Sequence, residues 1–190
     1  MKPPTYINVI RNPVDWFQSH YYFERFGWSR VEGNRNSFKM SPKLRDETID
    51  DCIKNKSPQC KVVPWKYIEY ICGNGPNCNS RNDKTVRRSV EIAKHALLNR
   101  FSVVGILEQF DDTMNLMVKK MPHIFEGIQQ ANNSPRMAQV RNMTKSIGQV
   151  KMNEKSRRYF ETGPLKYEYD LYKFARQLFN EQLRRSELKK

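Results

Sequence analysis

Long apolar runs are missing from this 190-residue sequence, and no stretch approaches the roughly 18 apolar residues that cross a membrane as a helix. Residues 1–4 lead directly into a strand-like segment, without the apolar region of a signal peptide. We therefore expect no targeting signal within this chain. Internal repeats and low-complexity blocks are also missing, and 38% hydrophobic residues over this length suit a single domain spanning residues 1–190.

Acidic residues are scarce relative to basic ones. The sequence has 20 Asp and Glu against 34 Lys and Arg, a formal charge of +14. Such an excess favours an anionic partner, because basic patches attract polyanions in a salt-dependent way. Charge alone leaves nucleic acid, an acidic membrane surface and a sulfated polysaccharide open. We expect no nucleic acid, because the aromatic residues have core-like spacing and no nucleic-acid motif is present.

The four cysteines lack the C-x2-C or C-x4-C spacing of a zinc knuckle, and none of the three histidines lies near them. Disulfides are therefore favoured over zinc, and we expect no metal. Four cysteines permit three pairings, of which the sequential one closes the shortest loops. Disulfides imply an oxidising secretory compartment and a stapled insertion at about residues 50–80. The cysteines are Cys52, Cys60, Cys72 and Cys78.

Three Asn-x-Ser/Thr sequons agree with a secretory compartment, although chance readily produces one or two in a chain of this length. They begin at Asn55, Asn132 and Asn142. Pro58 directly follows the first sequon and makes Asn55 a poor acceptor.

The chain opens with a strand, a turn and a helix. Thr5 to Ile10 is β-branched and aromatic, Pro13 suits the first position of a helix, and Gly27 suits its end. Residues 28–46 are polar and aperiodic, which indicates a loop.

The remaining pattern alternates helices and strands. A short helix is expected at 47–53, helices at 85–99, 110–121 and 164–185, a buried-type strand at 101–106, and a long basic loop at 126–156. The strand–helix–strand–helix order predicts an α/β fold with a parallel sheet flanked by helices.

Arg11 follows the first strand, and Ser19 lies two turns into the next helix. A guanidinium just beyond a strand can bind a phosphate through two hydrogen bonds, and a hydroxyl on the following helix can donate another. Ligands of open α/β sheets bind at this edge. An isolated arginine is, however, more often a surface residue.

With its context this element resembles the 3'-phosphate-binding segment of the heparan sulfate and uronyl 2-O-sulfotransferases, somewhat closer to the uronyl enzyme. The matching features are the strand ending Ile-Arg-Asn-Pro at residues 10–13, Ser19, and the aromatic run 21–27 that ends Arg-Phe-Gly. The resemblance covers about residues 5–183. It includes both cysteine spacings, the strand 101–105 leading to Glu108, and Asn-Met-Thr at 142–144.

The resemblance implies a P-loop-like sulfotransferase fold that is incomplete at the N-terminus. It further implies sulfuryl transfer from 3'-phosphoadenosine 5'-phosphosulfate (PAPS) to the 2-hydroxyl of a uronic acid in a glycosaminoglycan, sequential disulfides and a possible homotrimer. Arg11 and Ser19 would take the 3'-phosphate. Arg141 and Lys145 match a basic loop near the cofactor, and the loop that holds Arg30 and Arg35 resembles the acceptor-binding region.

In the family, the phosphosulfate loop and the catalytic histidine lie upstream of the first strand. We therefore expect the chain to be the C-terminal two-thirds of a Golgi type II membrane protein, with its membrane anchor upstream and no transferase activity by itself. His20, where the family has Tyr, is the remaining catalytic candidate within the chain, although a lone helix histidine is more often structural. The alternative is a catalytically silent protein that binds PAPS or a polyanion.

Overall fold

A computed structural model describes residues 4–27, 41–61, 66–78 and 82–187 of the chain. The chain divides into two compact units. Unit 1 comprises Met1–Pro13, Pro64–Gln129 and Lys166–Lys190, and unit 2 comprises Val14–Val63 and Gln130–Leu165. In the described residues, no helix is long and apolar enough to span a bilayer.

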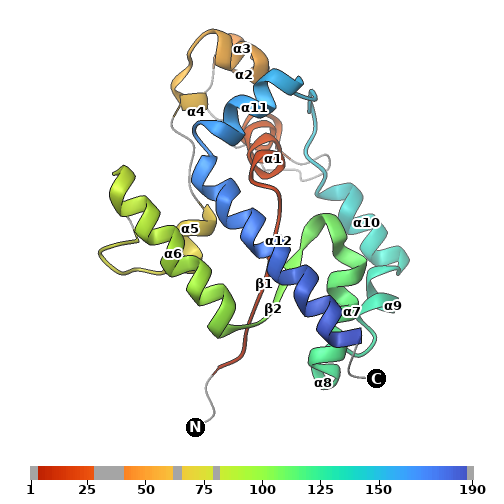
Figure 1. The fold of residues 1–190 in the computed structure, drawn as a ribbon. Coiled ribbons are helices and arrows are strands. Elements are labelled where there is room, and N and C mark those ends of the chain that lie inside the picture. The colour runs from red at the N-terminus through yellow and green to blue at the C-terminus, as the bar shows by residue number, and fades with distance from the viewer. Residues whose placement is uncertain (1–3, 28–40, 62–65, 79–81, 188–190) are drawn as a thin grey trace. The chain divides into compact units, whose positions relative to one another are not determined.

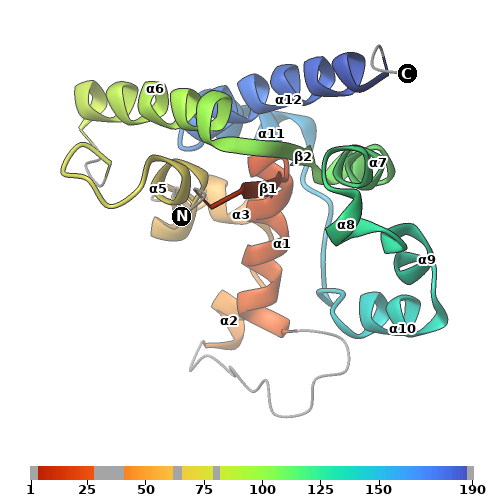
Figure 2. The same cartoon turned by 90° about the horizontal axis from the view of Figure 1, so that it is seen from below.

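Unit 1 contains a parallel pair of strands, β1 (Tyr6–Ile10) and β2 (Phe101–Ile106), and both end at the same edge because Ile10 pairs with Ile106. The helices α6 (Asp83–Arg100) and α12 (Lys166–Glu187) lie side by side near β2 (Figures 1 and 2). This arrangement confirms the expected α/β class and parallel pairing.

The core of unit 1 forms where α6, α12 and the two strands bury their apolar side chains. Helix α6 is amphipathic at the 3.6-residue period, so one face is buried while its basic residues stay outside. Helices α5 (Lys66–Cys72) and α7 (Phe110–Lys120) also pack in this unit. Fully buried core residues include Ile10, Val86, Leu97, Val104, Ile106, Leu116, Leu171 and Phe179.

Short elements complete unit 1. A 3-10 turn, η1 (Leu107–Gln109), follows β2, and α8 (Pro122–Phe125) follows α7. Cys72, at the end of α5, forms a disulfide with Cys78. The next helix, α9 (Ile128–Asn132), crosses from unit 1 into unit 2.

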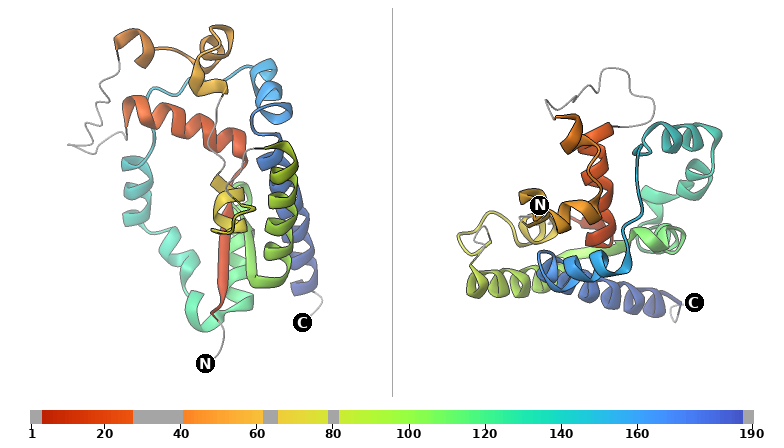
Figure 3. Two further views of the ribbon diagram at one scale, coloured as in Figure 1. Left: turned by 90° about the vertical axis from the view of Figure 1, so that its left-hand side faces the viewer. Right: turned by 90° about the horizontal axis from the view of Figure 1, so that it is seen from above.

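Unit 2 is built around α1 (Pro13–Phe26), which faces α11 (Glu154–Thr162) through the rings of Phe17 and Phe160, 4.7 Å apart. Gly27 ends α1 as predicted, because its φ of 72° is a conformation that glycine adopts without steric cost, and its N–H donates to the Phe23 carbonyl at 2.8 Å. Figure 3 shows this helix and the smaller helices of the unit from two further sides. They are α2 (Pro42–Arg45), α3 (Ile49–Lys54), α4 (Pro58–Lys61) and α10 (Pro135–Met143).

Two expectations about loops are wrong. Residues 126–156 hold α9, α10 and the start of α11 instead of a long loop, and α2 lies within the expected loop 28–46. Helix α10 has no buried residue, so it carries no apolar period that sequence analysis could detect. Its start is marked only by Ser134, whose hydroxyl accepts the Met137 N–H, and by Pro135 in the first turn.

Candidate functional site

Arg11 directly follows β1 at the carboxyl edge of the parallel strands, where ligands of α/β sheets bind. Its backbone N–H donates to the hydroxyl oxygen of Tyr67 at 3.2 Å. The next N–H, of Asn12, donates to Oε1 of Glu108 at 2.7 Å. Two side chains from other parts of unit 1 therefore hold the turn that carries Arg11.

Glu108 lies at the corresponding place after β2 and also contacts α12. Its Oε2 accepts the hydroxyl of Tyr172 at 3.2 Å. Burial, together with the nearby Glu108 carboxylate, raises the pKa of Tyr172 to about 12. Tyr172 therefore stays protonated at neutral pH and remains a donor to Glu108.

Glu168, one turn before Tyr172 on α12, is 1% exposed. Its two carboxyl oxygens accept the N–H groups of Tyr67 at 3.2 Å and Ile68 at 3.1 Å, at the start of α5. Burial outweighs these two bonds and raises the pKa of Glu168 from 4.5 to about 8. Burial also raises the pKa of Tyr67 above its ordinary range.

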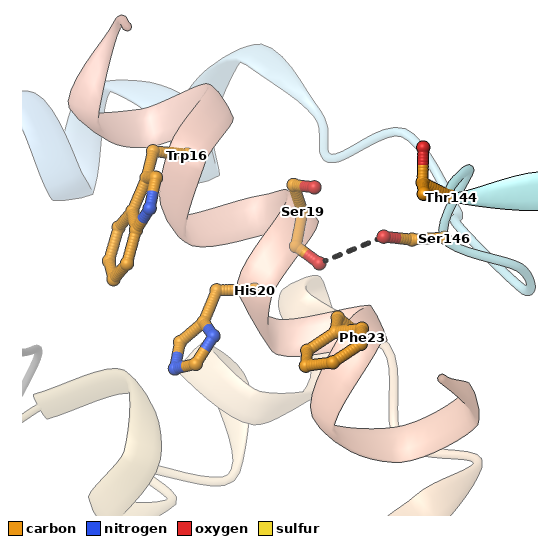
Figure 4. Close-up of a pocket in the computed structure, with 6 residues that line it drawn as sticks. All are labelled: Trp16, Ser19, His20, Phe23, Thr144 and Ser146. Atoms are coloured by element: carbon orange, nitrogen blue, oxygen red, sulfur yellow. Dashed lines mark hydrogen bonds between the residues drawn. The ribbon is translucent and has the colours of Figure 1, made fainter. Parts of the chain in front are cut away.

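In unit 2, Ser19 lines a hollow of about 200 Å³. The α1 side of the hollow also holds Trp16, His20 and Phe23, and the segment after α10 supplies Thr144 and Ser146 (Figure 4). The Ser146 hydroxyl donates to the Ser19 backbone carbonyl at 3.5 Å. The structure thus brings Ser19 together with the segment that contains Lys145.

His20 occupies one side of this hollow. Its ring stacks on Trp16 with centroids 5.0 Å apart, and its Nε2 lies 3.0 Å from Oε1 of Glu24, one turn along α1. This is the pattern of a histidine paired within its own helix. The contacts agree with the structural interpretation of His20 and leave a catalytic role untested.

Arg141 is exposed near the end of α10, and its guanidinium donates to two oxygens of Asn132, the backbone carbonyl at 2.8 Å and Oδ1 at 3.1 Å. Lys145 is exposed between the two hollow-lining residues Thr144 and Ser146. The predicted acceptor-binding residues Arg30 and Arg35 lie outside the described residues.

The aromatic run that matches the family at residues 21–27 is mainly structural. The Tyr21 hydroxyl donates to the Glu47 carbonyl at 3.1 Å. Arg25 is 5% exposed and places its guanidinium 3.3 Å from the centroid of the Tyr21 ring, and burial lowers its pKa. It also donates to the Tyr21 carbonyl and to the Gln59 side chain. This motif therefore holds α1 against the segment 47–59.

The structure joins Cys52 to Cys60 in unit 2 and Cys72 to Cys78 in unit 1, the sequential pairing that the resemblance implies. The two bonds use all four cysteines. Across the part of the chain that the structure describes, no group of three or more His, Cys, Asp or Glu side chains could hold a metal. Of the sequon residues, Asn55 and Asn142 are exposed and Asn132 is half-buried.

Sequence analysis missed the residues that support the Arg11 turn. Glu108 follows the matching strand at 101–105, but the sequence indicates no role for it. No local signal marks Tyr67, Glu168 or Tyr172. Tyr67 contacts the turn, Glu168 contacts Tyr67 and Tyr172 contacts Glu108, each across more than 50 positions of sequence. Ser146 was missed as a lining residue for a similar reason, because it contacts Ser19 from 127 positions away. Trp16 lies on the same helix as Ser19, but nothing in the sequence indicates that its ring borders a hollow.

Comparison with known proteins gives a consistent set of relatives, although no protein-family model matches the chain. The chain is 32% identical over 182 residues to uronyl 2-sulfotransferase of Mus musculus, covering 93% of this chain and 43% of the relative. The Homo sapiens protein of that name is 31% identical with the same coverage. Heparan sulfate 2-O-sulfotransferase 1 of Xenopus laevis is 29% identical, covering 94% of this chain and 48% of the relative. The chain spans slightly less than half the length of these curated relatives.

Proposed function

Because the chain is related over nearly its whole length to the uronyl and heparan sulfate 2-O-sulfotransferases, we propose that the whole protein sulfates a glycosaminoglycan. The reaction moves a sulfuryl group from PAPS to the 2-hydroxyl of a uronic acid, in heparan sulfate or in chondroitin or dermatan sulfate. The net charge of +14 supports a polyanionic acceptor. The fold proposed for the whole protein is the P-loop-like sulfotransferase fold.

One observation carries the proposal. Arg11 stands directly after a strand of a parallel pair, and the two N–H groups of its turn are held by Tyr67 and Glu108. A guanidinium placed there can bind the 3'-phosphate of PAPS through two charge-assisted hydrogen bonds. This is the role that the matching motif has in the family.

The other residue roles follow the same proposal. Ser19 contributes a hydroxyl to the 3'-phosphate, and Arg141 and Lys145 add positive charge near the cofactor. Arg30 and Arg35 contact the acceptor. The hollow beside Ser19, with Lys145 between two of its lining residues, supports the assignment of the 144–146 segment to the nucleotide.

The cellular setting is proposed on the same grounds. The whole protein would act in the Golgi as a type II membrane protein, where an oxidising lumen allows both disulfides. Assembly into a homotrimer, and glycosylation at the exposed Asn142, are parts of the same proposal.

Binding calorimetry tests the phosphate assignment. The protein should bind 3',5'-ADP better than 5'-AMP, and Arg11→Ala should remove most of that preference, a change of about ten- to a hundredfold. Arg88→Ala is the matched control, because it removes the same type of side chain from an exposed position on α6. Equal affinities for the two nucleotides in the unchanged protein would refute the assignment.

Sulfate transfer tests the reaction itself. Labelled PAPS is offered with desulfated heparin, chondroitin or dermatan, and the product disaccharides are analysed for 2-O-sulfated uronic acid. Label on that position supports the proposal and identifies the acceptor. Nucleotide binding without transfer by the whole protein would favour the catalytically silent alternative.

A further inference from the structure

We propose that Tyr67 and Glu108 are positioning residues for Arg11. They bind the two successive backbone N–H groups of the turn and so fix the direction in which the Arg11 side chain extends from the edge of the sheet. The inference rests on the proposed function, because it takes Arg11 as the phosphate-binding group. In this proposal Tyr67 and Glu108 act through Arg11 and do not contact the nucleotide themselves.

The turn needs such support because of where the regular elements end. Pairing between the strands ends at Ile10 and Ile106, and α1 begins at Pro13. Arg11 and Asn12 therefore lie between the hydrogen-bonding patterns of a strand and a helix, while their neighbours Ile10 and Pro13 are buried. Backbone N–H groups in this position require a partner, and the partners here are the Tyr67 hydroxyl and the Glu108 carboxylate.

The two supports approach from different elements. Tyr67 belongs to α5, and Glu108 belongs to the turn η1 that follows β2. The Arg11 N–H belongs to the peptide before Arg11, and the Asn12 N–H belongs to the peptide after it, so the two contacts hold the peptide planes on both sides of the Arg11 Cα. Either contact alone would leave one of these two planes freer to turn.

Helix α12 fixes both supports through one face. Glu168 and Tyr172 are four residues apart and so project from the same side of the helix. Glu168 accepts the backbone N–H of Tyr67, and Tyr172 donates to the free oxygen of Glu108. Two separate connections therefore run from a buried face of α12 to the turn, one through Tyr67 and one through Glu108, so the position of Arg11 depends on α12 through these two residues.

Loss of a positioning residue should affect nucleotide binding differently from loss of a residue that contacts the nucleotide. A bidentate arginine loses affinity when its guanidinium is misplaced by even a fraction of a hydrogen-bond length, so loosening the turn should weaken binding of the 3'-phosphate alone. A merely structural role would instead lower stability and reduce both nucleotide affinities in the same proportion. The ratio of the affinities for 3',5'-ADP and 5'-AMP separates the two cases.

The test measures that ratio by calorimetry, with thermal unfolding in parallel, in Tyr67→Phe, Glu108→Ala and Glu108→Gln. Tyr67→Phe removes only the oxygen that accepts the Arg11 N–H, and we expect the ratio to fall about three- to tenfold. Glu108→Ala should reduce it about threefold or more. Glu108→Gln should keep most of the ratio, because its amide oxygen still accepts from Asn12 and its amide N–H₂ can donate to the Tyr172 hydroxyl.

Tyr70→Phe is the matched control, since Tyr70 lies on the same helix as Tyr67 and is 75% exposed. It should leave the ratio unchanged. If Arg11→Ala abolishes the preference while Tyr67→Phe and Glu108→Ala preserve it, the positioning role is wrong and the proposed function stands. If Arg11→Ala itself leaves the ratio intact, the proposed function fails and this inference fails with it. Should Glu108→Ala not fold, Tyr67→Phe decides the question by itself.

Discussion

The hydroxyl of Thr113 binds both backbone polar groups of Ile106, the last residue of β2. It accepts the Ile106 N–H at 3.0 Å and donates to the Ile106 carbonyl at 3.0 Å, and Thr113 is fully buried. This contact ties α7 to the end of the strand, directly before the turn that carries Glu108. The placement of Glu108 therefore depends on how closely α7 approaches β2.

Gly105 permits that close approach. A Cβ atom at position 105 would overlap the Thr113 methyl group, so Gly105→Ala should lower the free energy of unfolding by about 1 to 3 kcal/mol. Urea unfolding measures the loss. Thr113→Ser deletes the obstructing methyl and keeps the hydroxyl, so in the double variant the Ala should cost much less. Strictly additive losses would show that this methyl is not what excludes a side chain at position 105.

Ser19 should contribute less to nucleotide binding than Arg11. Ser19→Ala removes one neutral hydroxyl, and one hydrogen bond to a charged group contributes about 1.5 kcal/mol or more, which corresponds to about a tenfold weaker affinity for 3',5'-ADP. The affinity for 5'-AMP, which has no 3'-phosphate, is the internal control and should not change. An equal loss of affinity for both nucleotides would show that Ser19 does not contact the 3'-phosphate.

The sequence predicted several of the elements that bury an apolar face, although not α5 or α11. Each prediction that was confirmed has a local physical cause. β-Branched residues indicate the strand before Arg11, the conformational freedom of Gly27 indicates the helix end, and a run of apolar residues indicates the strand that ends at Ile106. Helix α10 was missed because it buries nothing. The candidate site was predicted only as far as Arg11 and Ser19. The contact between Asn12 and Glu108 forms only when the two strands, which start 95 residues apart at Tyr6 and Phe101, pair in parallel.

Each disulfide should stabilise its own unit. Opening one with a pair of Cys→Ser changes, at 52 and 60 or at 72 and 78, should lower the free energy of unfolding by about 2 to 3 kcal/mol according to the chain-entropy model for such short loops. Denaturant unfolding measures the loss. Non-reducing peptide mapping of the protein produced in an oxidising compartment checks the connectivity. A peptide joining Cys52 to Cys78 would contradict the structure.

The stability of unit 1 should depend on pH through Glu168. Its pKa is raised from 4.5 to about 8 in the folded chain by burial, so between these values the native state holds a proton that the unfolded state has released. The free energy of unfolding therefore falls as pH rises through this interval, because stability decreases wherever the native state binds more protons. The contribution is fully present below pH 4.5 and is lost as pH passes about 8. Its size is on the order of a few kcal/mol.

Glu168→Gln provides the comparison, because glutamine has nearly the same shape and does not titrate. Urea unfolding of both proteins at pH 5, 6.5 and 8 should show the stability of the unchanged protein falling relative to the variant as pH rises, while every other ionisable group contributes alike to both. The variant can keep one of the two N–H acceptors that Glu168 provides to Tyr67 and Ile68, so it begins less stable at pH 5 and the difference narrows with pH. A difference that stays constant, or that widens with pH, would mean that these two N–H groups keep the carboxylate ionised despite its burial.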